Sequence, residues 1–291
     1  MRDQRMNQHG KVREAVSEAY SRAVRAPSEG GHPCCAPTQK GVVVKLAGYT
    51  REELDALPPE AVINSFGCGN PLAFSEVRES DVVLDLGSGA GIDILLAGKK
   101  VGPSGWVIGI DMTDEMIEKA RENIRRSGLT NVEVRKGIIE ELPVESSSVD
   151  WVISNCVINL SPEKPRVFAE IARVLKPGGR MLVSDIVVDS LPDRLREDRG
   201  LYSSCIAGAI SETEYLAGLR RAGLAEVEVR ERIVYDAAQL EAFVGSELGD
   251  GEPGSCGCGG TMADGSSAAE IAGSIVGKVW SAKVFARKPM P

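Results

Sequence analysis

Residues 82–92 read VVLDLGSGAGI, and this stretch decides the fold. Its first five residues are apolar except for Asp85, which is typical of a buried strand. Three glycines follow at alternate positions, Gly87, Gly89 and Gly91, before the apolar residues resume. Glycine is needed where the backbone turns sharply and where a ligand touches it. The stretch therefore predicts a strand, a tight turn and a helix that together hold a ligand.

Beyond this turn, apolar residues recur alternately with the spacing of helices and of strands. The expected helices are 92–100, 114–127 and 163–175, and the expected strands are 81–86, 106–110, 131–136, 149–154 and 180–188. The KPGG at 176–179 is a helix-stop signal. Such alternation predicts an α/β fold whose mostly parallel sheet carries helices on both faces.

The two ends of the chain are less regular. Helices are expected at 11–25, at 51–57, where Thr50 and Glu53 fit a capping box, and at 212–222. Strand-like alternation covers 224–235 and 276–287, and the last of these fits an antiparallel strand beside the fifth one. Between them, 246–267 is rich in glycine and serine, which is typical of a loop.

Composition excludes several classes of protein. The 291 residues carry a net charge of −8, which argues against nucleic acid or an anionic membrane as the main partner. No apolar run is long enough for a membrane span and no leader is seen, so we expect a cytoplasmic protein. The two histidines, His9 and His32, are expected to be solvated. Seven cysteines without a secretion signal disfavour a disulfide scaffold and favour redox or soft-ligand roles.

The spacing of the glycines indicates which class of ligand the turn binds. It is GxGxG, not the GxGxxG of dinucleotide binding, and Asp111 ends the second strand twenty positions after Gly91. A carboxylate there can accept both ribose hydroxyls of an adenosine. A generic nucleotide fold, or an NAD enzyme with an atypical turn, is the alternative.

This combination resembles the motif of class I S-adenosylmethionine-dependent methyltransferases, which have a Rossmann-like sheet. The resemblance implies that S-adenosylmethionine is the cofactor and that the glycine turn, which Asp85 precedes, lines its methionine end. It further implies that Asp111 holds the ribose, that Met112 packs on the adenine and that Asn155 lies near the methionine moiety. The cofactor residues expected are Asp85, Gly87, Ser88, Gly89, Gly91, Asp111, Met112, Asn155 and, in the adenine loop, Ile139 and Glu140.

Three cysteines follow or precede strands of this core. Cys156 comes just after the strand at 149–154, Cys205 follows the fifth strand, and Cys68 lies in a glycine-flanked turn. Open α/β sheets bind ligands at the carboxyl ends of their strands, so these thiols could meet at that edge of the sheet. The alternative for each is a buried thiol that packs as a small hydrophobe. Paired CxxC spacings for zinc are absent, whereas soft thiolates suit a trivalent metalloid.

The contexts of these cysteines resemble signature segments of the arsenite methyltransferase family, over about residues 10–245. The segments are GCGNP at 67–71, SNCVINL at 154–160 and CIAGAI at 205–210. The resemblance implies methylation of trivalent arsenic, often delivered as a glutathione conjugate, with Cys156 and Cys205 as arsenic ligands and Cys68 as third ligand or resolving thiol. It also implies that Tyr20 contacts the cofactor.

The same resemblance implies that Cys68 and an N-terminal cysteine, Cys34 or Cys35, exchange disulfides that keep the product reduced. Glutathione or a thioredoxin system is then the reductant. Cys256 and Cys258, in the glycine-rich stretch, belong to a flexible loop or form an arsenic relay or redox pair.

These expectations divide the chain into three segments. They are a lid with the cysteine pair (1–66), the cofactor-binding core (67–189), and a substrate-binding insertion with the remaining strands (190–291). Two alternatives to arsenic methylation stay open. One is a methyltransferase for a small organic acceptor such as a quinone or sterol, and the other is a non-catalytic protein that sequesters arsenic or zinc.

Overall fold

The computed structural model describes residues 2–25, 49–55, 57–63, 69–70, 76–196, 205–248 and 266–291. Two of the seven cysteines, Cys156 and Cys205, are in these ranges. The other expected site cysteines lie outside the described residues, namely Cys34, Cys35, Cys68, Cys256 and Cys258.

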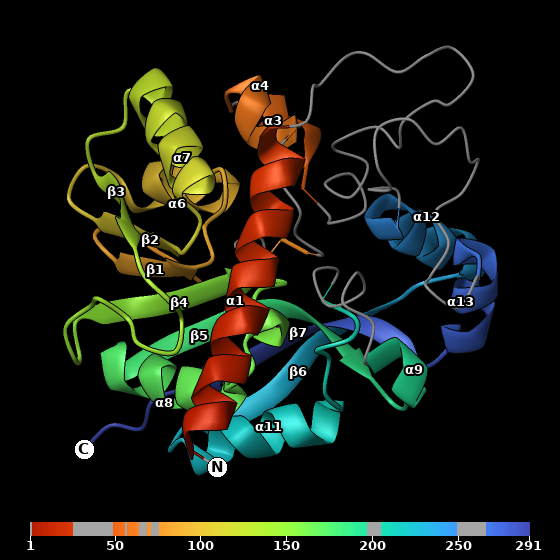
Figure 1. The fold of residues 1–291 in the computed structure, drawn as a ribbon. Coiled ribbons are helices and arrows are strands. Elements are labelled where there is room, and N and C mark those ends of the chain that lie inside the picture. The colour runs from red at the N-terminus through yellow and green to blue at the C-terminus, as the bar shows by residue number, and fades with distance from the viewer. Residues whose placement is uncertain are drawn as a thin grey trace.

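A seven-stranded sheet in the order β3-β2-β1-β4-β5-β7-β6 forms the centre of the molecule (Figure 1). Its first five strands are parallel, and β7 is antiparallel to both β5 and β6. The strands are β1 Val82–Leu86, β2 Trp106–Asp111, β3 Val132–Lys136, β4 Val149–Asn155, β5 Leu175–Val188, β6 Ala225–Val234 and β7 Val279–Arg287. The predicted Rossmann-like α/β fold with an inserted last strand is therefore confirmed.

Helices cover both faces of the sheet. They are α1 Arg2–Arg25, α3 Arg51–Asp55, α4 Pro59–Ile63, α6 Ile92–Val101, α7 Asp114–Ser127, α8 Lys164–Val174, α9 Asp193–Arg196, α11 Glu212–Arg221, α12 Ala237–Leu248 and α13 Ala268–Ile275, with a short 3-10 helix, η1, at Ile158–Leu160. No described helix combines the length and apolar character that a membrane span requires.

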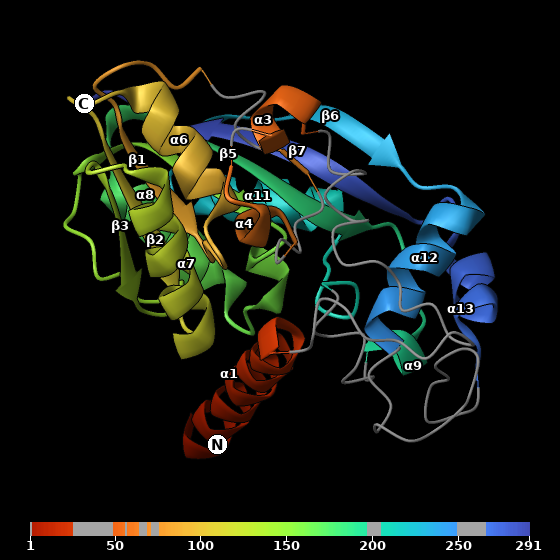
Figure 2. The same ribbon diagram turned by 90° about the horizontal axis from the view of Figure 1, so that it is seen from above.

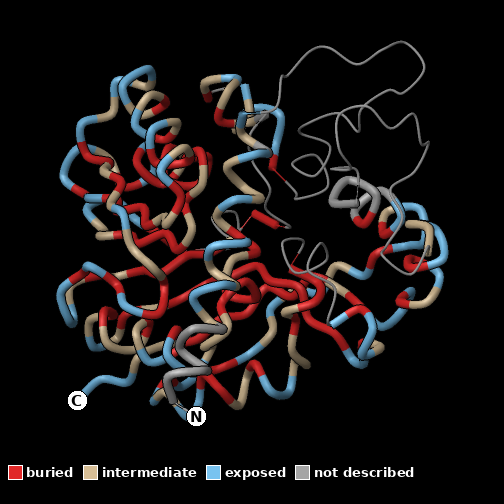
Figure 3. The backbone as a smooth tube through the Cα atoms, viewed as in Figure 1, coloured by how far each residue is buried: buried red, intermediate tan, exposed pale blue. Residues whose placement is uncertain are grey.

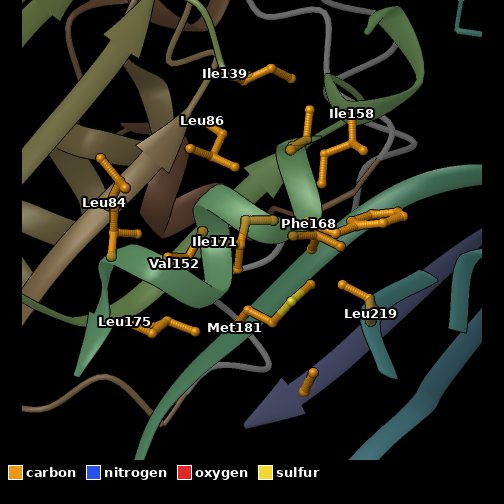
Figure 4. Close-up of a cluster of buried hydrophobic side chains, with 14 of the residues drawn as sticks. Leu84, Leu86, Ile139, Val152, Ile158, Phe168, Ile171, Leu175, Met181 and Leu219 are labelled. Atoms are coloured by element: carbon orange, nitrogen blue, oxygen red, sulfur yellow. The ribbon is translucent and has the colours of Figure 1, made fainter. Parts of the chain in front are cut away.

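Alternate residues of β1 show how the two faces are filled. Val83 packs with residues of α6 and α7, whereas its neighbour Leu84 packs with residues of α8 and α11 on the other face. Figure 4 shows the second of these clusters, in which Phe168 and Ile171 of α8 lie over the sheet. The backbone of the sheet is accordingly buried along most of its length, as Figure 3 shows.

Several elements at the rim differ from expectation. Helix α8 ends at Val174, just before the KPGG stretch, as expected. Strand β5 begins at Leu175 and not at residue 180, because Gly178 and Gly179 hydrogen-bond with Lys288 and so remain in the sheet. Helix α1 begins at Arg2, well before the expected start at residue 11. Helices α12 and α13 were not predicted. They pack on each other beside the ends of β6 and β7, as Figure 2 shows.

Candidate cofactor pocket and cysteine site

A pocket with about 910 Å³ of empty space, open solvent included, lies at the carboxyl ends of β1, β2 and β4. Helix α1 crosses the front of the sheet in Figure 1 and closes one side of this pocket. The residues that line it are Arg13, Val16, Tyr20, Ala61, Gly87, Ser88, Gly89, Ala90, Ile92, Asp93, Ile110, Asp111, Met112, Thr113, Met116, Gly137, Ile138, Ile139, Glu140, Asn155, Val157, Leu160 and Ser161.

The glycine turn is left-handed at all three glycines. The φ angles of Gly87, Gly89 and Gly91 are 69°, 51° and 99°, a region that side chains disfavour. A Cβ at Gly87 would also lie 2.4 Å from the side chain of Val157, so the turn can approach this residue, two positions after β4, only with glycine there. The turn also places the buried Ser88 in the pocket lining, with its Oγ close to Gly109 of β2 and without a hydrogen-bond partner among the described atoms.

Asp111 is held by the turn that it faces. One carboxylate oxygen accepts from the backbone N–H of Gly89 at 2.9 Å, and the other accepts from Thr113 N–H at 2.9 Å. Burial raises the pKa of Asp111, while these backbone donors oppose the rise. Each oxygen keeps lone-pair capacity, so the carboxylate can also accept the two hydroxyls of a ribose. The site therefore fits an adenosine group.

Glu140 joins the pocket to α1. Its carboxylate is buried and accepts from Arg13 at 3.0 Å and from Ser161 Oγ at 2.7 Å. Helix α1 is also tied to α7, where Ser21 donates to Glu115 at 2.7 Å. His9, which was expected to be solvated, is partly exposed, and its Nδ1 lies 3.4 Å from a Glu163 oxygen. These contacts fix α1 as one wall of the pocket.

A second buried carboxylate, Asp93, begins a network at the opposite side. It accepts from the Tyr49 hydroxyl at 2.8 Å and from the Asn155 amide at 3.4 Å. The side-chain nitrogen of Asn155 also donates to the Tyr49 hydroxyl at 3.0 Å. The side-chain oxygen of Asn155 accepts from the backbone N–H of Gly69 at 3.0 Å. The network thus fastens Gly69, the residue after Cys68, to the end of β4.

Gly69 itself approaches the sheet so closely that no larger residue fits. A Cβ there would lie 2.4 Å from the Oγ of Ser184. Ser184 also accepts the backbone N–H of Cys156, at 2.8 Å, through its carbonyl. Asn155, Cys156 and Gly69 therefore meet at one place on the sheet edge.

The two described cysteines are in contact. The thiol of Cys205 donates to the backbone carbonyl of Cys156, and both side chains are buried among apolar residues that include Leu160 and Ile186. Both residues have left-handed backbones, with φ of 59° at Cys156 and 65° at Cys205. Such strain in non-glycine residues is often found at functional sites. Cys156 is disulfide-bonded, whereas Cys205 is a reduced thiol.

Charged groups lie behind Cys205. The ammonium of Lys164 donates to the carbonyls of Asn159 and Ser161 at 3.1 and 3.0 Å, and burial lowers its pKa to about 8. Burial raises the pKa of the nearby Asp185 to about 7, although Lys164 opposes that rise. Lys164 interacts electrostatically with both Asp185 and Cys205, so this end of the site is polar beneath an apolar surface.

Most of the cofactor residues expected from the sequence gather in one place. Two of the expected residues, Asp85 and Gly91, do not line the pocket; those that do are Gly87, Ser88, Gly89, Asp111, Met112, Ile139, Glu140, Asn155 and Tyr20. Cys156 and Cys205 do not line it, but both chain neighbours of Cys156, Asn155 and Val157, do.

Sequence reasoning missed several polar residues of this region, among them Arg13, Tyr49 and Asp93. Asp93 carried a signal, since it is an acid between two isoleucines directly after the glycine turn. Arg13 and Tyr49 carried none, because their segments meet the pocket only in the folded chain. Among the described residues, no group of three Cys, His, Asp or Glu side chains has the geometry of a metal site.

Comparison with known proteins agrees with this site. A family model described as a methyltransferase domain matches residues 78–223, which include the glycine turn and both described cysteines. With its parallel core and adenosine-type pocket, the chain is a class I methyltransferase by fold and family.

Curated relatives narrow the family. The chain is 35% identical over 252 residues to an arsenite methyltransferase of Aquipseudomonas alcaligenes, a match that covers 82% of this chain and 69% of the relative. It is 46% identical over 202 residues to an arsenite methyltransferase of Halobacterium salinarum, covering 69% of this chain. The chain belongs to the arsenite methyltransferase family.

A solved structure supports the same placement. The crystal structure of an arsenic(III) S-adenosylmethionine methyltransferase from Chlamydomonas reinhardtii matches with a TM-score of 0.59 and 30% identity, over 88% of this chain and 75% of that one. The match spans only 51% of the length of the Halobacterium salinarum relative.

Proposed function

We propose that the protein transfers a methyl group from S-adenosylmethionine to trivalent arsenic held by cysteine thiolates, which yields methylated arsenicals for detoxification in the cytoplasm. The observation that carries this proposal is the contact of Cys205 with Cys156, one residue from Asn155 in the lining of the adenosine-type pocket. Membership of the arsenite methyltransferase family supports it.

The cofactor, when bound, supplies an electrophilic methyl group on a sulfonium. The chain's own contribution is position: Asp111 receives the ribose, the turn at 87–91 receives the methionine end, and Met112, Ile139 and Glu140 enclose the adenine. Tyr20 and Arg13, on α1, cover the cofactor. A correct near-attack geometry supplies roughly 7–11 kcal/mol. The lone pair of trivalent arsenic carries no proton, so the transfer needs no general base.

Arsenic capture depends on thiolates. Cys156 and Cys205 exchange with the oxygen or glutathione ligands of arsenite, with Cys68 as third ligand or resolving thiol, and their protons are lost on binding. Cys156 is oxidised in this structure, so it must be reduced before it binds arsenic. A thiol reductant, glutathione or thioredoxin, fits this need, and Cys34 or Cys35 is the exchange partner of Cys68.

The decisive experiment supplies the reduced protein with labelled S-adenosylmethionine and one acceptor at a time. We expect label in methylated arsenicals when the acceptor is arsenite or its glutathione conjugate, and none in a quinone or sterol. Label in the organic acceptor alone would overturn the arsenic assignment. Failure to bind S-adenosylmethionine, with arsenic still bound, would point to a sequestering protein instead.

A further inference from the structure

Lys164 occupies a position that disfavours lysine. It is the first residue of α8, and a cation at the amino end of a helix opposes the helix dipole. Its ammonium is also largely removed from water, and this burial lowers its pKa to about 8. Such a group destabilises the fold unless its hydrogen bonds compensate, so the groups that it binds indicate its role.

The ammonium of Lys164 bridges two turns of one short segment, residues 156–161. It donates to the carbonyls of Asn159 and Ser161, at 3.1 and 3.0 Å. Asn159 and Ser161 also tie this segment to different regions. Asn159 donates to Asp185 on β5 at 2.8 Å, whereas Ser161 donates to Glu140 in the adenine loop at 2.7 Å. Lys164 interacts electrostatically with both of these acids, so it lies between an anchor on the sheet and an anchor on the cofactor pocket.

The segment 156–161 belongs to both sites. Three of its residues line the cofactor pocket, whereas its first residue, Cys156, contacts Cys205. Its backbone therefore determines how the thiols are oriented toward the cofactor. Methyl transfer requires the acceptor to be in line with the sulfonium, and a misplacement of about 1 Å can slow such a reaction about 100-fold.

We propose that Lys164 is a positioning residue of the methyl transfer: its ammonium holds the segment 156–161 so that arsenic on the thiols is aligned with the methyl group of S-adenosylmethionine. The inference rests on the proposed function, since alignment matters only where both reactants bind. Lys164 is outside the lining of the pocket and has no contact with the cofactor to make. Its loss should therefore lower the rate of transfer and leave the affinities unchanged.

Lys164→Met tests this role, because methionine keeps a long apolar stem and lacks the N–H donors. We expect the kcat of arsenite methylation to fall about 30-fold or more, with KM for S-adenosylmethionine and for arsenite within about threefold of wild type. Lys164→Arg keeps the donors and the charge and should recover most of the rate. The hydrogen-bonded amides of Cys156, Leu160 and Ser161 should exchange with deuterium about tenfold faster in Lys164→Met.

Lys288→Met is the matched control. The ammonium of Lys288 also donates to two backbone carbonyls, of Leu175 at 2.7 Å and of Arg173 at 3.5 Å, and burial lowers its pKa as well. Leu175 begins β5, whereas Cys156 hydrogen-bonds to that strand much later, at Ser184. Lys288→Met should lower stability in urea by a similar amount but leave kcat and the exchange of residues 156–161 unchanged.

Several results would overturn the positioning role. They are a wild-type kcat in Lys164→Met, a loss that lies wholly in KM, an equal loss of kcat in Lys288→Met, and unchanged exchange of residues 156–161. If Lys164→Met does not fold, Lys164→Gln, which is shorter and uncharged, replaces it in both measurements. A wild type that methylates no arsenite would refute the proposed function, and the exchange rates would still decide whether Lys164 holds the segment.

Discussion

The cofactor pocket and the cysteine site lie side by side but are built in different ways. The pocket forms around one continuous turn, 87–91, in which the backbone N–H of Gly89 donates to Asp111 and the left-handed positions are all glycines. The cysteine site joins residues 49 positions apart, Cys156 and Cys205, and both adopt left-handed backbones without being glycine. One region is specified locally, and the other only by the folded chain.

This difference assigns the two regions different tasks. Polar donors and carboxylates in the pocket suit a charged, hydroxylated cofactor, whereas the apolar surroundings of the thiols suit a soft centre and exclude water. Asn155 touches both regions, since it lines the pocket and precedes Cys156. Variants on either side of Asn155 should therefore separate cofactor binding from arsenic capture.

The largest effect is expected on the cysteine side. Cys205→Ser keeps a donor for the Cys156 carbonyl but replaces a soft ligand with a hard one. We expect arsenic methylation to be abolished, while the Kd of S-adenosylmethionine stays within about twofold of wild type. Cys156→Ser, tested in reductant, should behave in the same way. Full activity in either variant would refute its role as an arsenic ligand.

On the pocket side, Asp111→Ala should mainly weaken the binding of S-adenosylmethionine. Its carboxylate is the acceptor for Gly89 and Thr113 and is available to the ribose, and hydrogen bonds to a charged group contribute about 1.5–3 kcal/mol each. We expect a Kd for S-adenosylmethionine roughly 10–100-fold higher, with arsenic binding to the thiols intact. An unaltered Kd would contradict the assignment of Asp111.

The same contrast explains what the sequence could predict. The glycine turn, Asp111 and the alternating elements were predictable because each depends on residues near one another in the chain. The capping box of Thr50 and Glu53 is confirmed for the same reason, with both reciprocal hydrogen bonds present. Residues close together in the chain determine these features, so they can be predicted from the sequence.

Features that depend on tertiary contacts were harder to predict from the sequence. The early start of α1 was missed because residues 2–10 are polar and show no apolar periodicity, and His9 meets its partner Glu163 only in the folded chain. The contact between Cys156 and Cys205 could be expected only from the rule that ligands gather at the carboxyl ends of strands. The network of Tyr49, which has no signal of its own, could not be predicted.

Low pH should weaken the binding of S-adenosylmethionine, by a smaller amount than Asp111→Ala does. The pKa of Asp93 is raised to about 6, chiefly by burial, so the group is ionised above that pH and neutral below it. A cationic ligand prefers the ionised form, and so its affinity should fall as pH drops through about 6, by up to about tenfold per unit. The neighbouring acids do not oppose this change. Glu53 also raises the pKa of Asp93, and Asp93 in turn raises the pKa of Asp85.

The measurement is the Kd of S-adenosylmethionine between pH 5 and 7.5, in wild type and in Asp93→Asn. The variant should lose most of the pH dependence. A wild-type Kd that is constant over this range would show that the charge of Asp93 does not act on the ligand.

The smallest effect concerns the strained backbone of the cysteine side. At Cys205, φ is 65°, and an L-residue in the left-handed region is disfavoured by about 1–2 kcal/mol, whereas glycine is not. Cys205→Gly and Cys205→Ala both remove the thiol, so their difference reports the backbone alone. After the larger conformational entropy of glycine in the unfolded chain is deducted, we expect Cys205→Gly to be more stable by roughly 1 kcal/mol in urea denaturation with reductant. Equal stabilities would mean that this turn relaxes when the thiol is gone, and that contact with Cys156, not the fold around it, sets the left-handed backbone.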